Sequence, residues 1–218
     1  RVPCPHTNLV KIPESVGDER ALCVGDILAT GYWAAKISEA EEGDEILIIG
    51  AGPVGLCAAM CARLKSPSRI IFCEKSAWRR GFAKKLLPGA ECISPADMPE
   101  IMRTFARGGA DRVLECGGNA QTFDMAWRYG RPNAVVVVAA LYDDAQVLPL
   151  PDMYGKNLTL KFGGVDGCDC EEILKLIEEG KIDTSPLITH TFALKDIAAA
   201  YDLFERGGDG VLKVAVRP

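Results

Sequence analysis

The feature that most constrains the fold is an apolar run that ends in a turn rich in glycine. The run Ile46–Ile49 leads directly into Gly50-Ala51-Gly52-Pro53-Val54-Gly55, and the residues from there to Arg63 have a helical pattern. A strand, a tight glycine turn and a helix in this order begin a strand–helix–strand unit. The segment therefore predicts an α/β domain built around it.

Each glycine has a separate role in such a turn. Gly50 permits the tight bend, Gly52 lets the backbone approach a pyrophosphate, and Gly55 allows the helix to pack closely on the strand. The helix N-terminus at Pro53 and Val54 adds free N–H groups and a partial positive charge, which attract phosphate. We expect all five residues to line a dinucleotide site.

Short β-branched runs alternate with longer helical patterns from Glu45 onward. Strands are expected at Glu45–Ile49, Arg69–Cys73, Glu91–Ile93, Arg112–Glu115, Ala134–Ala139 and Leu158–Phe162. Helices are expected between them at Gly55–Arg63, Ala77–Leu87, Pro99–Ala106 and Gln121–Trp127. Because the strands are apolar without polar alternation, helices should cover both faces of the sheet. The pattern predicts a doubly wound parallel sheet of about six strands, a Rossmann fold, over residues 41–165.

Two flanking segments lie outside this core. Residues 1–40 contain one expected helix, Tyr32–Ala40, which leads into the core. Residues 166–218 contain the expected helices Glu171–Glu179 and Lys195–Glu205 and a closing strand, Val211–Val216. The second of these helices carries apolar residues at helical spacing, so we expect it to pack on another element.

An acidic residue stands at the end of the second expected strand. Glu74 lies 24 residues after Gly50, close to the roughly 20-residue spacing of the acidic residue that binds the adenine ribose. A carboxylate here accepts hydrogen bonds from both ribose hydroxyls and repels a 2′-phosphate, which favours NAD over NADP. The basic residues Lys75, Arg79 and Arg80 follow closely and leave binding of such a phosphate open as an alternative.

Composition argues against several classes of function. The formal net charge is −5, whereas binding to nucleic acid requires clustered Lys and Arg. No apolar run reaches the roughly 18–20 residues of a membrane helix. The nine cysteines are odd in number and irregularly spaced, which predicts free thiols, and Cys168-x-Cys170 is interpreted as a loop and not as half of a metal site. With no secretory leader at the chain start, we expect a cytoplasmic protein.

The chain resembles the zinc-type medium-chain alcohol dehydrogenases in several segments that occur in the same order. These segments are residues 2–13, Asp26–Tyr32, Gly50–Gly55, Ala110–Gly117 and Gly210–Val216. The resemblance implies that residues 41–165 bind the cofactor. It also implies that residues 1–40 are the remnant of a catalytic domain, toward which residues 166–218 return. The family's other catalytic zinc ligands, a Cys and a His, belong to an N-terminal domain that these residues do not include.

The resemblance also implies roles for individual residues. Asp26 falls where family members place the third protein ligand of the catalytic zinc, and its oxygen suits Zn²⁺. A second interpretation, in which Asp26 caps the following helix, stays open, although the expected helix begins too far downstream. Besides the glycine turn and Glu74, the residues expected to contact NAD are Thr30, Arg79, Cys116, Gly117, Ala139, Ala140 and Lys213. One departure from the family is Arg131-Pro132-Asn133, which replaces a glycine pair and is expected to form a turn.

The activity that the resemblance implies is hydride transfer between an alcohol and NAD, with zinc binding the substrate oxygen. The substrate is expected to be a secondary alcohol or polyol, or the corresponding carbonyl compound. Because a catalytic zinc needs three protein ligands, these 218 residues are expected to bind NAD without turnover. Three alternatives stay open: a zinc-free quinone reductase, a methyltransferase that uses S-adenosylmethionine, and a nucleotide-binding module without catalysis.

The last expected strand of the core indicates how the chain associates. Leu158–Phe162 should lie at the edge of the sheet, where an apolar strand is a pairing hazard unless it is used. Members of the resembled family commonly pair their cofactor domains edge to edge. We therefore expect a homo-oligomer, a dimer or tetramer, formed through this edge.

Overall fold

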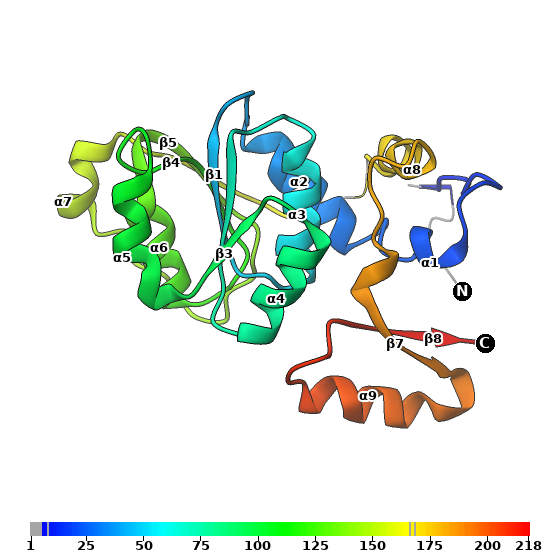
Figure 1. Cartoon of the computed structure of the whole chain (residues 1–218). Coiled ribbons are helices and arrows are strands. Elements are labelled where there is room, and N and C mark those ends of the chain that lie inside the picture. Colours follow the sequence, from blue (N-terminus) through cyan, green and yellow to red (C-terminus); the bar gives the residue numbers. More distant parts are fainter. Residues whose placement is uncertain (1–5, 8, 166, 168) are drawn as a thin grey trace.

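The computed structural model describes residues 6–7, 9–165, 167 and 169–218. Its centre is a six-stranded parallel sheet in the order β3-β2-β1-β4-β5-β6 (Figure 1). The strands are β1 (Glu45–Ile49), β2 (Arg69–Cys73), β3 (Glu91–Ile93), β4 (Ala110–Glu115), β5 (Gly130–Val138) and β6 (Thr159–Phe162). The strand order reverses between β1 and β4, so the crevice at their carboxyl ends is the topological switch point. The predicted Rossmann fold is confirmed.

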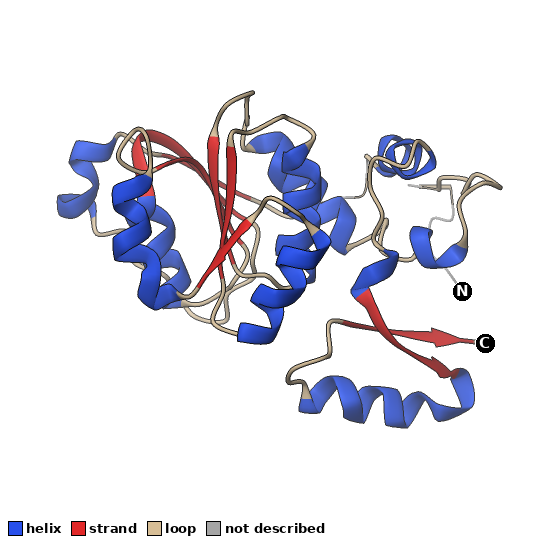
Figure 2. Cartoon of the chain, viewed as in Figure 1, coloured by secondary structure: helices blue, strands red, loops and turns tan. Residues whose placement is uncertain are grey.

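Helices cover both faces of the sheet (Figures 1 and 2). One layer contains α2 (Ile27–Ile37), α3 (Pro53–Arg63) and α4 (Ala77–Leu86), and the other contains α5 (Met98–Ile101) and α6 (Ala120–Tyr129). In β1, Ile46 and Ile48 face the first layer, whereas Leu47 and Ile49 face the second. Successive side chains of a strand point to opposite faces, so a strand covered on both sides has no polar position.

The chain leaves the sheet after β6 and forms a smaller lobe. This lobe contains α8 (Cys170–Glu178), β7 (Ile188–Ala193), α9 (Ile197–Arg206) and β8 (Lys213–Arg217). Strands β7 and β8 pair in parallel, and α9 connects them (Figure 1). The expected packing of α9 is met mainly through Ala200, which is buried, whereas Tyr201 and Phe204 are exposed. None of the helices in the described ranges is long and apolar enough to cross a membrane.

Short helical segments complete the chain. They are α1 (Asp18–Ala21), α7 (Leu150–Met153) and the 3₁₀ turns Pro95–Asp97, Met102–Thr104, Tyr154–Lys156, Ser185–Leu187 and Leu194–Asp196. The third turn supplies Lys156, whose Nζ donates hydrogen bonds to the carbonyl oxygens of Trp127, Arg128 and Gly130 at the end of α6. A cation at this end of a helix satisfies carbonyl groups that have no partner within the helix.

The expected boundary of the helix before the sheet was wrong. The expected helix Tyr32–Ala40 is α2, which begins at Ile27 and includes Thr30 and Gly31. Gly31 lies inside this helix at the point where α3 crosses it. Glycine is required there because a Cβ would lie 2.5 Å from the backbone nitrogen of Ala58. Tertiary contact therefore decides the assignment of a residue whose local preference is against a helix.

Other boundaries also differ. The expected helix Pro99–Ala106 is only α5 and one 3₁₀ turn, because Phe105 is extended with its ring buried, and the N–H of Ala106 donates to Glu45 Oε2 at 2.7 Å. The expected turn Arg131-Pro132-Asn133 lies inside β5. There the register with β4 shifts and Asn133 has a φ of 63°. Such a bulge tolerates a proline, which has no N–H to donate.

Two more sequence expectations concern the C-terminal part. Strand β7 was not expected, and the closing strand begins at Lys213 instead of Val211. The seven cysteines in the described ranges carry free thiols. Cys168, which was expected in a loop, lies outside the described residues.

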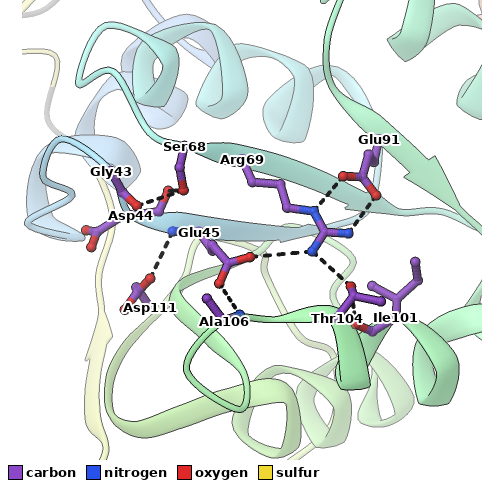
Figure 3. A network of polar contacts seen from close by, with 10 residues as sticks. All are labelled: Gly43, Asp44, Glu45, Ser68, Arg69, Glu91, Ile101, Thr104, Ala106 and Asp111. Carbon is purple, nitrogen blue, oxygen red and sulfur yellow. Dashed lines mark hydrogen bonds and ion pairs between the residues drawn. The ribbon is translucent and has the colours of Figure 1, made fainter.

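A network of ion pairs joins the amino ends of the strands (Figure 3). Arg69 of β2 donates from Nε to Glu91 Oε1 at 2.5 Å and from Nη2 to Glu91 Oε2 at 2.7 Å. Its Nη1 contacts Thr104 Oγ1 at 2.9 Å and Glu45 Oε1 at 3.4 Å. Asp111 of β4 accepts the N–H of Glu45 at 2.9 Å. The network thus ties β1, β2, β3 and β4 together opposite the edge where the site is expected.

The Arg69–Glu91 pair predicts a pH-dependent contribution to stability. The hydrogen bond from Arg69 lowers the pKa of Glu91 below the usual 4.5, so the pair stabilises the fold above that pH and stops doing so as the pH falls through the lower folded pKa. Glu91→Gln should lower the free energy of unfolding by about 0.5–1 kcal/mol at pH 7, because the carboxylate is half-exposed, and by less at pH 3. Urea unfolding at both pH values, with Glu100→Gln as the control, measures this. An equal loss at pH 3 and pH 7 would contradict it.

The crossing of α2 and α3 predicts a large steric effect. A Cβ on Gly31 would lie 2.6 Å from the carbonyl carbon of Cys57, so Gly31→Ala must push two helices apart, at a cost of about 3 kcal/mol. Gly81→Ala is the matched control, since Gly81 is also helical but nothing lies within 4 Å of the added carbon. That variant should be neutral or gain up to about 1 kcal/mol from helix propensity. Thermal unfolding of both variants measures the difference in stability. Equal stability of Gly31→Ala and Gly81→Ala would contradict the close contact between α2 and α3.

Candidate functional site

The glycine turn lies at the carboxyl end of β1, as its spacing requires. Gly50 has a φ of 97°, and the next helix begins at Pro53 with Gly52 as its N-cap. A Cβ on Gly55 would lie 2.1 Å from the carbonyl oxygen of Gly50, so only glycine allows α3 to start this close to the turn. No side chain caps this end of α3, so its first N–H groups remain available to an anion.

Gly52 faces the open side of this turn. In the described ranges, the one heavy atom within 4 Å of an added Cβ is Nη1 of Arg79, at 3.9 Å. The guanidinium of Arg79, from the first turn of α4, therefore lies over the glycine turn. A cation above free N–H groups is a suitable arrangement for a pyrophosphate.

Glu74 is buried directly beside the turn. Only 5% of the residue is exposed, and its carboxylate accepts the N–H of Ala51 at 2.8 Å through Oε2 and the N–H of Ser76 at 2.8 Å through Oε1. The two bonds join the loop after β1 to the loop after β2. A carboxylate held by backbone donors at the end of β2 is in position to meet the hydroxyls of a ribose.

The basic residues near Glu74 differ in their contacts. Nη1 of Arg80 donates to the carbonyl oxygens of Glu74 and Lys75, at 2.8 Å each, so it already holds the loop after β2. The side chain of Lys75 is exposed, and Arg79 lies over Gly52. Of the three residues that could receive a 2′-phosphate, Arg80 is thus engaged with the backbone.

The loops after β4 and β5 complete the edge next to β1. The N–H of Cys116 donates to Ile49 O at 2.9 Å, and the N–H groups of Ala139 and Ala140 donate to Glu115 O at 2.9 and 3.2 Å. A Cβ on Gly50 would lie 3.1 Å from Cys116 O. These contacts bring Cys116, Gly117, Ala139 and Ala140 to the same edge as the glycine turn.

A buried carboxylate also organises this second half of the edge. Glu115 is fully buried, and its Oε1 accepts the N–H groups of Gly117 at 2.7 Å and Gly118 at 3.0 Å. Its Oε2 and the hydroxyl of Tyr142 are buried without a hydrogen-bond partner among the described residues. Burial, and after it the Glu115 carboxylate, raise the pKa of Tyr142, so this phenol stays protonated at neutral pH.

Asp26 and Thr30 come from α2. Asp26 occupies the N-cap position of α2, but its side chain makes no capping bond and the residue is exposed. The carboxylate is therefore free of the helix. Thr30 Oγ1 donates to Asp26 O at 2.9 Å. The expectation that Asp26 lies too far upstream to reach the N-cap was wrong, because the helix starts five residues earlier than expected.

Lys213 belongs to the smaller lobe, at the start of β8. It is half-buried on β8, and its charge lies close enough to Cys57 of α3 to oppose the burial that raises the pKa of that thiol. Within the described ranges, no three or more His, Cys, Asp or Glu side chains gather in a way that could hold a metal ion.

Sequence reasoning missed several residues of this edge. Glu115, Ser76 and Tyr142 were not singled out, and neither was Asp209, which accepts a hydrogen bond from Ser76 Oγ at 3.0 Å. Glu115 could have been found from its place at the end of an apolar strand, as Glu74 was. Asp209 could not, because it meets Ser76 across 133 positions of sequence.

Comparison with known proteins gives a consistent picture. A family model described as zinc-binding dehydrogenase matches residues 53–179. The alcohol dehydrogenase of Cupriavidus necator is 32% identical over 227 positions, which cover all of this chain and 61% of that protein. The NADP-dependent isopropanol dehydrogenase of Thermoanaerobacter brockii is 27% identical over 96% of this chain and 62% of that protein.

The fold agrees with these sequence matches. The apo form of zinc-dependent alcohol dehydrogenase 2 from Streptococcus pneumonia superposes with a TM-score of 0.91 at 28% identity. The match covers all of this chain and 63% of that one, so the chain spans about three fifths of the length of its relatives. The resemblance seen in the sequence is confirmed, and the chain belongs to the zinc-binding dehydrogenase family.

Proposed function

We propose that the chain is the cofactor-binding part of a zinc-dependent oxidoreductase that transfers hydride between NAD and an alcohol, a secondary alcohol or a polyol. The observation that carries this proposal is the buried carboxylate of Glu74, which the backbone of the glycine turn holds at the carboxyl end of β2. The carboxylate would accept the ribose hydroxyls, and its charge would oppose a 2′-phosphate.

The remaining residues at this edge suit the other parts of the dinucleotide. The free N–H groups at the start of α3 and the guanidinium of Arg79 would bind the pyrophosphate, with Lys213 of β8 as a further cation for it. The loops that carry Cys116, Gly117, Ala139 and Ala140 would line the nicotinamide, with Thr30 beside it. NAD, when bound, supplies the ring carbon that accepts the hydride, and the protein orients that ring and excludes water.

Asp26 is the one residue of this chain that we propose as a zinc ligand. Its exposed carboxylate makes no capping bond, so it is free to act as an oxygen ligand. A catalytic zinc needs three protein ligands, and the described residues bring no such group together. We therefore infer that this chain alone binds NAD without converting an alcohol.

Two further inferences follow from the surface and the thiols. We infer a cytoplasmic location, because the seven described cysteines are all free thiols. We also infer a homo-oligomer, a dimer or tetramer, formed through β6. That strand has one neighbour in the sheet, β5, and ends in Phe162, which is 59% exposed.

Cofactor binding can be tested by calorimetric titration with NADH and with NADPH. We expect tighter binding of NADH. Glu74→Gln should weaken NADH binding about tenfold, because a charged acceptor contributes about 1.5–3 kcal/mol to a hydrogen bond. It should also reduce the preference for NADH over NADPH. Glu171→Gln, on the exposed face of α8, is the control and should bind like the parent chain. Tighter binding of NADPH would contradict the choice of cofactor, and no binding of either nucleotide would contradict NAD binding by this chain.

Association through β6 can be tested by sedimentation at micromolar concentration. Phe162→Lys should convert an oligomer into a monomer, because it puts a charge on the edge where two copies would pair. Phe204→Lys is the matched control, since Phe204 is similarly exposed, at 53%, but lies on α9. If Phe162→Lys leaves the mass unchanged, or the parent chain is monomeric, the inference about β6 is wrong.

A further inference from the structure

One loop of the smaller lobe reaches the part of the sheet edge where the ribose is expected. Asp209 lies between α9 and β8, and Gly207, Gly208 and Gly210 around it all have positive φ values. In Figure 1 this loop turns upward below α4. Ser76 Oγ donates a hydrogen bond to Asp209 Oδ1 at 3.0 Å. The loop therefore touches the N-cap residue of α4.

Ser76 stands between two carboxylates. Its backbone N–H donates to Glu74 Oε1 at 2.8 Å, and its hydroxyl donates to Asp209. The hydroxyl oxygen also accepts the N–H of Arg79 at 3.2 Å, as the cap of α4. Both donor groups of Ser76 are therefore occupied by acidic side chains, one from each lobe.

The contact between Ser76 and Asp209 disfavours the binding of an anion at the N-terminus of α4, which would otherwise attract one. The N-terminus of α4, a helix of ten residues, carries a partial positive charge, and Arg79 lies in its first turn. A hydroxyl at the N-cap could donate to a phosphate there. The bond to Asp209 uses that donor and adds a negative charge at hydrogen-bond distance from it.

We propose that Asp209 is a specificity-determining residue that excludes a 2′-phosphate from the adenine ribose. The inference rests on the proposed function, in which Glu74 binds the ribose hydroxyls. A phosphate on the 2′-hydroxyl would then lie beside Ser76 and face both carboxylates. Of the nearby cations, Arg80 is engaged with two carbonyl oxygens, which leaves Arg79 and Lys75 to balance these charges.

The test compares ADP-ribose with 2′-phospho-ADP-ribose, which differ only in the phosphate. Both are titrated calorimetrically into the parent chain, Asp209→Asn and Asp202→Asn. Asp209→Asn should bind the 2′-phosphorylated ligand about five- to tenfold more tightly, with the gain shrinking at high salt, and should bind ADP-ribose within about twofold of the parent. Asp202→Asn removes the same charge from an exposed position of α9, outside the loop that holds Asp209. It should change the affinity for neither ligand.

The outcomes separate this inference from the function on which it rests. If ADP-ribose binds the parent chain and Asp209→Asn leaves the ratio of the two affinities unchanged, the role of Asp209 is wrong and the proposed cofactor site stands. An equal gain in Asp202→Asn would also overturn it, because the effect would then come from net charge alone. If neither ligand binds the parent chain, the cofactor site and the role of Asp209 both fail.

Discussion

The structure depends on a steric constraint at the glycine turn. Gly55 lies so close to Gly50 that a single added carbon would come within 2.1 Å of the Gly50 carbonyl oxygen. Because this contact is between backbones, no change of rotamer can relieve it. It sets the position of α3 on the sheet. Through the second close approach at Gly31, α3 then sets the position of α2, and with it Asp26 and Thr30.

Buried carboxylates connect the loops at both edges of the sheet. Glu74 and Glu115 accept backbone N–H groups at the carboxyl edge, and Asp111 accepts one at the amino edge, where Glu45 also holds the N–H of Ala106. Moving these loops apart would break hydrogen bonds to buried carboxylates, which costs free energy. Loop ends with no regular hydrogen bonding of their own are thus kept in place.

The smaller lobe contacts the loop that follows β2 although the two segments are far apart in sequence. Asp209 contacts the start of α4, and the charge of Lys213 opposes the burial that raises the pKa of Cys57 in α3. Both belong to the segment that follows α9, so the pairing of β7 with β8 controls where the two charges lie. The smaller lobe thus places the Asp209 carboxylate next to the loop that follows β2.

The sequence by itself determined the sheet and the place of the glycine turn within it. Apolar strands without alternation and a glycine turn of defined spacing were sufficient for the six strands, the helices on both faces and the positions of the glycines and Glu74, because these depend on local pattern and covalent geometry. The start of α2, the bulge at Asn133, strand β7 and the break at Phe105 could not be predicted, since long-range packing overrides local preference there. The contact between Ser76 and Asp209 was likewise decided by tertiary structure alone. A hydrogen bond between side chains far apart in sequence has no signature in the order of residues.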